Sequence, residues 1–273
     1  MPSLLTLGAP YTVFNPKSGI EGAAGFDYLW PNQPWYFVFD VRYGQTKTAT
    51  ANSSSFHSSI IFPFGTPSFA FAQTTTTADQ GTEKESHFVA DFMIGRDLGV
   101  GSNAPELMIG LRVVDLRATA SVTATGQHTF YSSSVTFGPH DPTVALAANG
   151  AWTSSFFGGG PRVAIAGGVP IIDPWSFDYG AGIAGLIGNR TFNFVVSGTN
   201  GFFSGDTNSP TGILNVDGSA ALSYRITPAF KISAGVRADY YSTPLTTYNI
   251  STGAQQNIDR LYWGPFVRLT GAF

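Results

Sequence analysis

The chain has 273 residues, enough for one large all-β domain over residues 1–273, and only 11% of them are charged while 14% are aromatic. A net charge of -3 argues against a nucleic-acid partner, and the lack of cysteine excludes disulfides and thiolate metal sites. No stretch approaches the roughly 18 apolar residues of a membrane helix. A low charge without such a helix fits a β-barrel, whose strands show only alternate residues to lipid.

The first half of the chain predicts five strands from side chains that alternate with a period of two. They are 3–13, which is weak, 20–30, 35–44, 84–97 and 105–122. Within 105–122 the phase slips at Val113-Val114, and this predicts a β-bulge after which Leu116 faces outward and Arg117 inward. Residues 1–5 lack the basic stretch and the apolar core of a secretion signal, so an envelope location requires that a signal has been removed.

The second half predicts five more strands, at 155–170, 175–194, 212–225, 229–242 and 258–273. The closing strand is the clearest, because every second residue back from Phe273 to Leu261 lacks a polar side chain. Its other residues are mixed and include Arg260 and Arg268. A strand that stops on an aromatic terminal residue is unusual for a soluble protein.

Short and long connections alternate along the chain. The short ones lie near 31–34, 98–104, 171–174 and 226–228, and the long polar ones near 48–83, 123–153, 196–210 and 243–257. Together with the strands, they predict a transmembrane antiparallel up-and-down β-barrel of about ten strands, or eight if two weak segments fail. Large aromatic residues flank the short turns, as in a membrane-interface girdle: Trp30, Trp35, Trp175, Tyr179, Tyr224 and Phe230. A soluble sandwich or lipocalin-like barrel is the alternative, but it has no reason to turn these side chains outward.

The predicted inward face carries charges of both signs. The residues that we expect to line the lumen are Asp40, Arg42, Asp91, Arg112, Arg117, Arg162, Asp178, Arg237, Asp239 and Arg268. In a barrel this narrow, side chains largely fill the interior, so one interpretation is a closed network of ion pairs. The other interpretation is a narrow polar passage lined by the same residues.

Catalytic patterns are sparse. His87 lies two residues from Glu85, with Ser86 between them, and an outer-membrane hydrolase could use this combination. Nothing else in the spacing supports an enzyme, and an exposed histidine is the simpler interpretation. We therefore expect no enzyme activity, no metal and no cofactor.

Two segments carry a resemblance to a known family. Gly159-Gly160-Pro161-Arg162-Val163 and the ending Tyr262-Trp263-Gly264-Pro265-Phe266-Val267-Arg268-Leu269 resemble the Legionella major outer-membrane protein family and related proteobacterial barrels. The resemblance covers the last four or five strands. The terminal Phe273 is similar to the aromatic end that the barrel-assembly machinery reads in Gram-negative outer-membrane proteins. Because this chain has no cysteine, the disulfide cross-linking of that family does not carry over.

The resemblance implies a location in the Gram-negative outer membrane. Its porin-like role favours a narrow channel for small solutes as the function, with a closed structural or adhesive surface barrel as the alternative. The implied partners are outer-membrane lipid, lipopolysaccharide and the barrel-assembly machinery.

Overall fold

The computed structural model describes residues 19–30, 33–61, 71–98, 105–132, 143–198, 201–227, 230–249 and 254–271. Ten antiparallel strands account for nearly all of them. The strands are β1 (Gly19–Leu29), β2 (Trp35–Thr46), β3 (Ala49–Ile61), β4 (Phe71–Asp97), β5 (Glu106–Ser132), β6 (Thr143–Ile172), β7 (Trp175–Gly198), β8 (Gly201–Thr227), β9 (Phe230–Asn249) and β10 (Ala254–Gly271). None of the residues in these ranges forms a helix that is long and apolar enough to cross a membrane.

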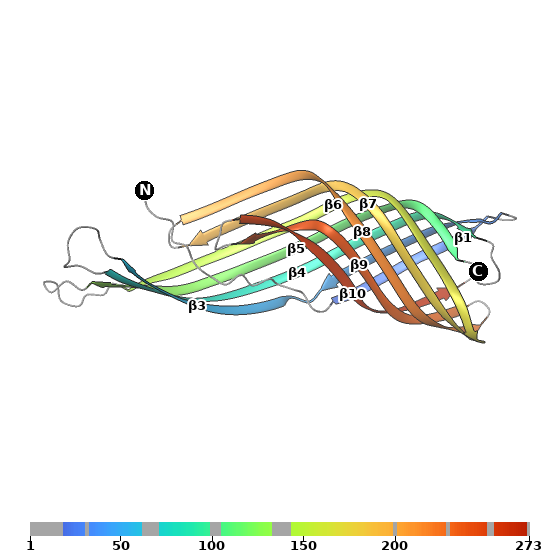
Figure 1. Cartoon of the computed structure of the whole chain (residues 1–273), viewed down its shortest axis with the longest axis horizontal. Coiled ribbons are helices and arrows are strands. Elements are labelled where there is room, and N and C mark those ends of the chain that lie inside the picture. Colours follow the sequence, from blue (N-terminus) through green and yellow to red (C-terminus); the bar gives the residue numbers. More distant parts are fainter. Residues whose placement is uncertain are drawn as a thin grey trace.

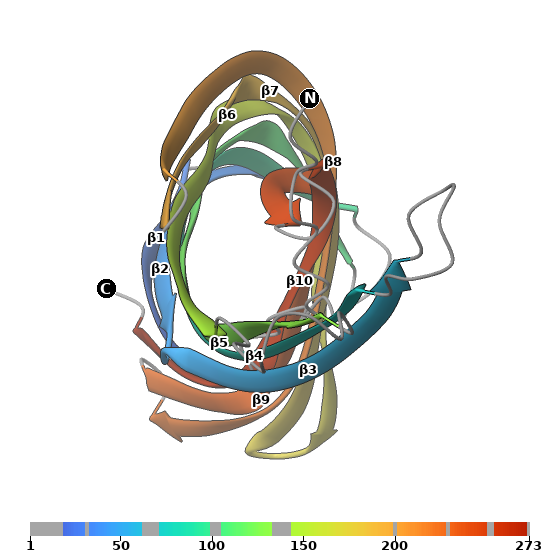
Figure 2. The ribbon, with the colours of Figure 1, turned by 90° about the vertical axis from the view of Figure 1, so that its left-hand side faces the viewer.

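The strands form one up-and-down sheet that curves around a central space (Figures 1 and 2). The sheet runs β1-β2-β4-β5-β6-β7-β8-β9-β10, and β3 continues the line of β2 by pairing with the first half of β4. The all-β antiparallel barrel architecture expected from the sequence is therefore confirmed. No pairing between β1 and β10 is found within the described ranges, and side chains span that seam instead.

The strand count agrees with the sequence, but the strands are not the same ten. The predicted strand 3–13 lies outside the described residues. The tenth described strand is β3, which lies inside the segment 48–83 that was expected to be a loop. The other long loops are also largely strand. β5 continues to Ser132, β6 begins at Thr143, and the β7–β8 and β9–β10 hairpins close between 198 and 201 and between 249 and 254.

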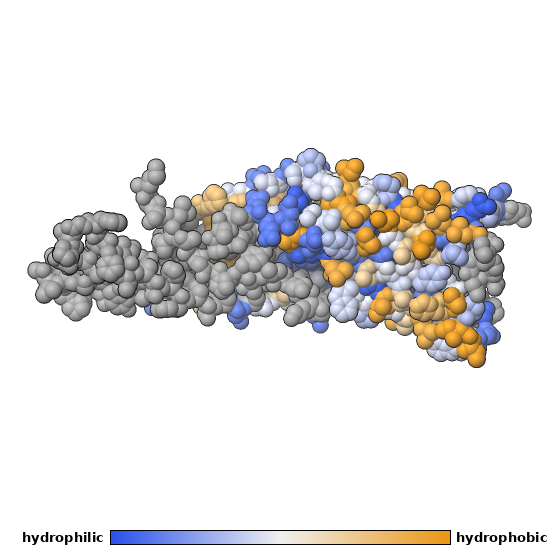
Figure 3. All heavy atoms as spheres, in the orientation of Figure 1, coloured by the Kyte–Doolittle hydropathy of each residue, from blue (hydrophilic) through white to orange (hydrophobic). Residues whose placement is uncertain are grey.

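The two ends of the sheet differ in their outer surface. The connections at 30–34, 98–105, 173–174 and 228–229 share one end, which we call the turn end; the opposite end is the far end. Exposed apolar side chains surround the sheet near the turn end, on the right in Figures 1 and 3. On β4, for example, Phe88, Phe92 and Ile94 face outward between Lys84 and Arg96. We call this belt the apolar band.

Aromatic residues lie where the sequence placed them. Trp30, Trp35, Trp175, Tyr224 and Phe230 are exposed at the turn end of the band, and Tyr179 is half-buried. Trp175 and Tyr224 also pack edge to face, with ring centroids 4.9 Å apart. A strand of about 9–11 residues spans a membrane, so strands of 27 and 30 residues such as β5 and β6 extend far beyond the apolar band.

One predicted irregularity is absent. The pairing of β5 with β4 and β6 runs without a register shift through Val113 and Val114, so there is no bulge. Leu116 is consequently fully buried inside and Arg117 is exposed on the outer face, the reverse of what the sequence indicated. Arg117 is therefore removed from the lumen-lining set.

Candidate functional site

The centre of the lumen is filled by charged side chains that come from six strands. Arg112 of β5 is the hub. Its Nε and Nη2 donate to the two carboxylate oxygens of Asp91 on β4, at 2.7 and 2.6 Å, and its Nη1 donates to Asp217 on β8 at 3.0 Å. Nη1 also donates to Asn215 Oδ1. Each of the three nitrogens of this guanidinium therefore donates to at least one acceptor, which offsets the cost of burying its charge.

Two further arginines complete the arrangement. Arg162 of β6 donates to both oxygens of Asp217, with Nη2 to Oδ1 at 2.9 Å. Arg42 of β2 reaches across the lumen to Asp239 of β9, with Nη1 and Nη2 donating at 2.9 and 3.2 Å. These are paired, fork-like contacts, the geometry that best offsets the cost of removing charges from water.

Asp40 and Arg237 border the same group. Arg237 Nε donates to Asp239 at 3.2 Å, and the Asp40 carboxylate lies 3.5 Å from Arg42 Nε. We call the whole group the waist network; its members are Asp40, Arg42, Asp91, Arg112, Arg162, Asn215, Asp217, Arg237 and Asp239. Its four arginines balance its four aspartates. The side chains of Arg42 and Arg112 are 0% exposed, so other groups pack around both guanidinium groups on every side at this level of the lumen.

The waist network contains seven of the ten residues that the sequence assigned to the lumen. Asp178 also faces inward, but nearer the turn end, where it binds Lys231 Nζ at 2.7 Å and Ser223 Oγ at 2.6 Å. Arg268 lies on the inward side of β10, exposed and over the ring of Phe266. Asn215 was missing from the predicted inward residues, although its alternation with Leu214 and Val216 places it inside; the same alternation predicts the inward position of Asp217, which the structure confirms.

An apolar layer lies on the far-end side of the waist network, also inside the barrel. Its buried members include Leu116, Phe156, Leu186, Ile213 and Leu245. Leu245 belongs to β9, whereas the residues that surround it belong to β5, β6, β7 and β8. The interior is therefore occupied by buried side chains at two levels, by ion pairs at one and by apolar packing at the other.

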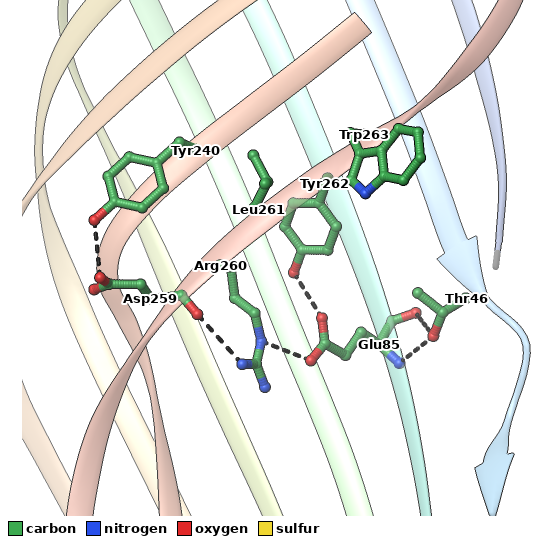
Figure 4. A pocket seen from close by; sticks show the side chains of 8 residues that line it. All are labelled: Thr46, Glu85, Tyr240, Asp259, Arg260, Leu261, Tyr262 and Trp263. Carbon is green, nitrogen blue, oxygen red and sulfur yellow. Dashed lines mark hydrogen bonds and ion pairs between the residues drawn. The ribbon is translucent and has the colours of Figure 1, made fainter. Parts of the chain in front are cut away.

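A third group joins β10 to β4 across the seam, as Figure 4 shows. Glu85 lies 2.7 Å from Arg260 Nε and accepts a hydrogen bond from Tyr262 Oη at 3.1 Å. Glu83 lies 3.3 Å from Arg260 Nη2. Glu85, Arg260 and Tyr262 border a pocket of about 280 Å³, which is lined by Thr46, Glu85, Tyr240, Asp259, Arg260, Leu261, Tyr262 and Trp263.

The structure does not bring Ser86 and His87 together on one face of β4, as the hydrolase combination weighed in the sequence would need. His87 Nε2 lies 2.6 Å from a Glu21 carboxylate oxygen, and its ring packs against Tyr262 at a centroid distance of 4.6 Å. Ser86 is on the opposite side of β4, because successive residues of a strand face opposite ways. No group of three or more potential metal-binding side chains occurs within the described part of the chain.

A glycine of β7 leaves space for the Arg162 side chain of the waist network. A Cβ atom at Gly182 of β7 would lie 2.5 Å from Nη2 of Arg162, so only glycine lets this guanidinium lie against the strand. We expect Gly182→Val to push Arg162 away from Asp217 and to lower the free energy of unfolding by about 1–3 kcal/mol. Chemical unfolding in detergent measures this. Gly185→Ala is the matched control, since a Cβ there meets nothing within 4 Å; an equal loss in both variants would contradict the steric argument.

The seam group gives a pH-dependent expectation. Glu83 lies on β4 before Lys84 and outside the apolar stretch of that strand. Its burial and, to a smaller extent, the charge of Glu85 raise the pKa of Glu83 from 4.5 to about 7. A carboxyl group whose pKa is higher in the folded state contributes most to stability below pH 4.5, and that contribution is lost as the pH rises towards 7. Glu83→Gln should therefore flatten the fall in unfolding free energy over this interval. An unchanged pH dependence of unfolding would show that another group causes it.

Comparison of the chain with protein-family models, with curated proteins and with solved structures found no match.

Proposed function

We propose that this chain is an outer-membrane β-barrel with a closed lumen, which serves a structural or adhesive role at the cell surface. The buried waist network is the observation that carries the proposal. A conducting barrel needs a continuous polar path, whereas here Arg42 and Arg112 are fully buried in ion pairs that reach across the lumen.

The outer surface supports the membrane part of the proposal. A belt of exposed Phe, Ile, Leu and Val with tryptophan and tyrosine at its border matches the lipid-facing surface of membrane barrels. In water, a contiguous apolar belt of this size would instead promote association. The turn end would then face the periplasm and the far end the exterior.

The far end supports the surface role. The part of β5 that lies there carries Thr119, Ser121, Thr123 and Thr125 exposed on its outer face. This part extends the wall beyond the apolar band, so it would present a polar β-surface outside the membrane. A surface of this kind suits contact with other cells or with the envelope.

The narrow channel remains a prediction from the sequence and from the resemblance to the Legionella major outer-membrane protein family. It requires the ion pairs of the waist network to separate. The partners implied by the resemblance, which are outer-membrane lipid, lipopolysaccharide and the barrel-assembly machinery, remain part of the same proposal.

Cell fractionation tests the location and orientation. The chain, exported from a Gram-negative host with a secretion signal, should sediment with outer membranes. A single cysteine at Thr123, on the exposed far half of β5, should react with a membrane-impermeant maleimide on intact cells. Recovery in the soluble periplasm would refute the membrane location. Labelling only after the cells are opened would refute the orientation.

A further inference from the structure

The far half of β9 leaves the barrel wall. The pairing of β8 with β9 ends at Asn215 and Tyr241, although β8 extends back to Gly201 and β9 on to Asn249. Beyond that point β9 contacts β5, β6 and β7, which are not its neighbours in the sheet. The view along the barrel shows the orange-red ends of β9 and β10 turning inside the ring (Figure 2). Pro244, Leu245 and Thr246 are buried in succession, whereas a wall strand would alternate.

A small number of contacts hold this segment in the lumen. Leu245 inserts into the apolar layer, and Ile258 of β10 packs against the same layer. The Thr246 amide donates to Ser154 Oγ on β6 at 2.8 Å, and Arg190 of β7 donates to the Thr243 carbonyl at 3.0 Å. The hairpin thus covers the waist network from the far end.

The bend has the features of a hinge. Thr243 has a φ of 47°, in the left-handed region that β-branched residues rarely adopt, and the proline that follows it disfavours this conformation further. On the paired strand, the register shifts between Ile258 and Arg260. Asp259, inside this shift, accepts a hydrogen bond from the Thr243 amide and another from Tyr240 Oη, each at 2.8 Å. The strain is therefore localised at one position and held there by one carboxylate.

The departure of β9 leaves an edge of β8 that no described strand pairs with. Within the described residues, 207–214 of β8 pair with β7 on one side and with no strand on the other. The Leu214 amide, which points to that edge, donates to the side chain of Ser242 at 2.8 Å instead of to a backbone carbonyl. If the register of Asn215 with Tyr241 simply continued, Ser209 would face Thr247 and Asn208 would face Tyr248.

We propose that residues 242–249 of β9 and 254–258 of β10, the far half of the hairpin, form a displaceable plug with two alternative positions. In one position, Leu245 fills the apolar layer and the lumen is covered. In the other, β9 straightens at Thr243 and pairs with residues 207–214 of β8, which opens the interior to the far end as deep as the waist network. The exchange replaces the apolar contacts of Leu245 with backbone hydrogen bonds along β8. It also releases the backbone of Thr243 from its left-handed conformation. The inference concerns the barrel itself and holds whether or not the proposed surface role is correct.

Disulfide trapping tests both positions, because the natural chain has no cysteine to interfere. In purified full-length protein, the pair Ser154→Cys with Thr246→Cys reports the plugged position. Two pairs report the straightened position: Ser209→Cys with Thr247→Cys, and Asn208→Cys with Tyr248→Cys. Consecutive antiparallel pairs alternate between two geometries, so one of these two suits a disulfide. The pair Ser204→Cys with Thr247→Cys is the control for random collision.

We expect the plugged pair and at least one straightened pair to oxidise, and the control pair to stay reduced. Formation of the plugged disulfide also shows that each barrel is folded. A plugged disulfide without either straightened one would overturn the proposal and make the hairpin a fixed filling. The proposal would also be overturned if the plugged pair failed to form its disulfide, or if the control pair oxidised as fast as the straightened pairs.

The hinge provides a second test. Glycine adopts the left-handed region without cost, so Thr243→Gly should favour the plugged position. We expect the straightened disulfide to form at least about fivefold more slowly in this background. An unchanged rate would show that Thr243 does not control the exchange and would contradict the hinge.

Discussion

Replacing Arg112 with alanine should lower the free energy of unfolding by about 3–5 kcal/mol. The Arg112 guanidinium contacts Asp91, Asn215 and Asp217, and its side chain is fully buried. Its removal leaves the Asp91 carboxylate with Arg162 Nε at 3.7 Å as its remaining basic neighbour, in a place that water does not reach easily. Denaturant unfolding in detergent micelles or lipid vesicles measures the loss.

Arg117→Ala is the matched control for this experiment. Arg117 lies on the same strand, five positions further on, but on the exposed outer face. Removal of an exposed charge should change stability by less than about 0.5 kcal/mol. If Arg112→Ala were as mild as Arg117→Ala, the waist network would not be a buried group whose charges depend on one another.

The second large effect concerns the outer face. Val236 of β9 is 56% exposed within the apolar band, so Val236→Arg would place a cation in the hydrocarbon region. We expect a cost of about 2–4 kcal/mol in lipid. The control, Thr123→Arg, adds the same side chain to the exposed outer face of β5 at the far end, and it should be close to neutral.

The measurement is refolding into lipid vesicles at a series of denaturant concentrations. In the proposed orientation, only the first of the two substitutions meets lipid. Equal stability of the two variants would show that the apolar band does not face a membrane.

The sequence predicted the turn-end half of the barrel well. There, one face of each strand is apolar and the other is polar or small, so alternation such as that of Phe88, Phe92 and Ile94 with Asp91 is visible in the sequence. Most of the waist network followed from this alternation. Which charges pair could not be predicted, since partners such as Arg42 and Asp239 are almost two hundred residues apart.

The far-end half was mistaken for loops because its strands have no apolar face. Segments such as 49–55 and 119–127 carry Thr, Ser and Ala on both sides, so no hydrophobic period marks them as strands. Threonine favours strands, but propensity alone did not separate these segments from polar loops.

The misplacement of Arg117 has a related cause. Inside a membrane barrel, a polar interior is expected, so the apolar residues Leu116 and Ala118 were assigned to the outside and a bulge was inferred. They are inside because the register of β5 continues without a shift, and there they belong to the same buried cluster as Leu245 of the folded-in hairpin. That hairpin depends on a bend at Thr243 and on contacts with distant strands, and no local sequence pattern reveals them.

Planar-bilayer recording on the unaltered protein tests the central claim, which is that the waist network closes the lumen. We predict no stepwise currents from membranes that contain the folded barrel, at either polarity. Arg112→Ala should lose stability and still lack the sustained, uniform conductance of an open pore. Regular single-channel steps from the unaltered protein, altered in size or ion preference by Arg112→Ala or Arg162→Ala, would contradict the closed barrel and establish the channel in its place.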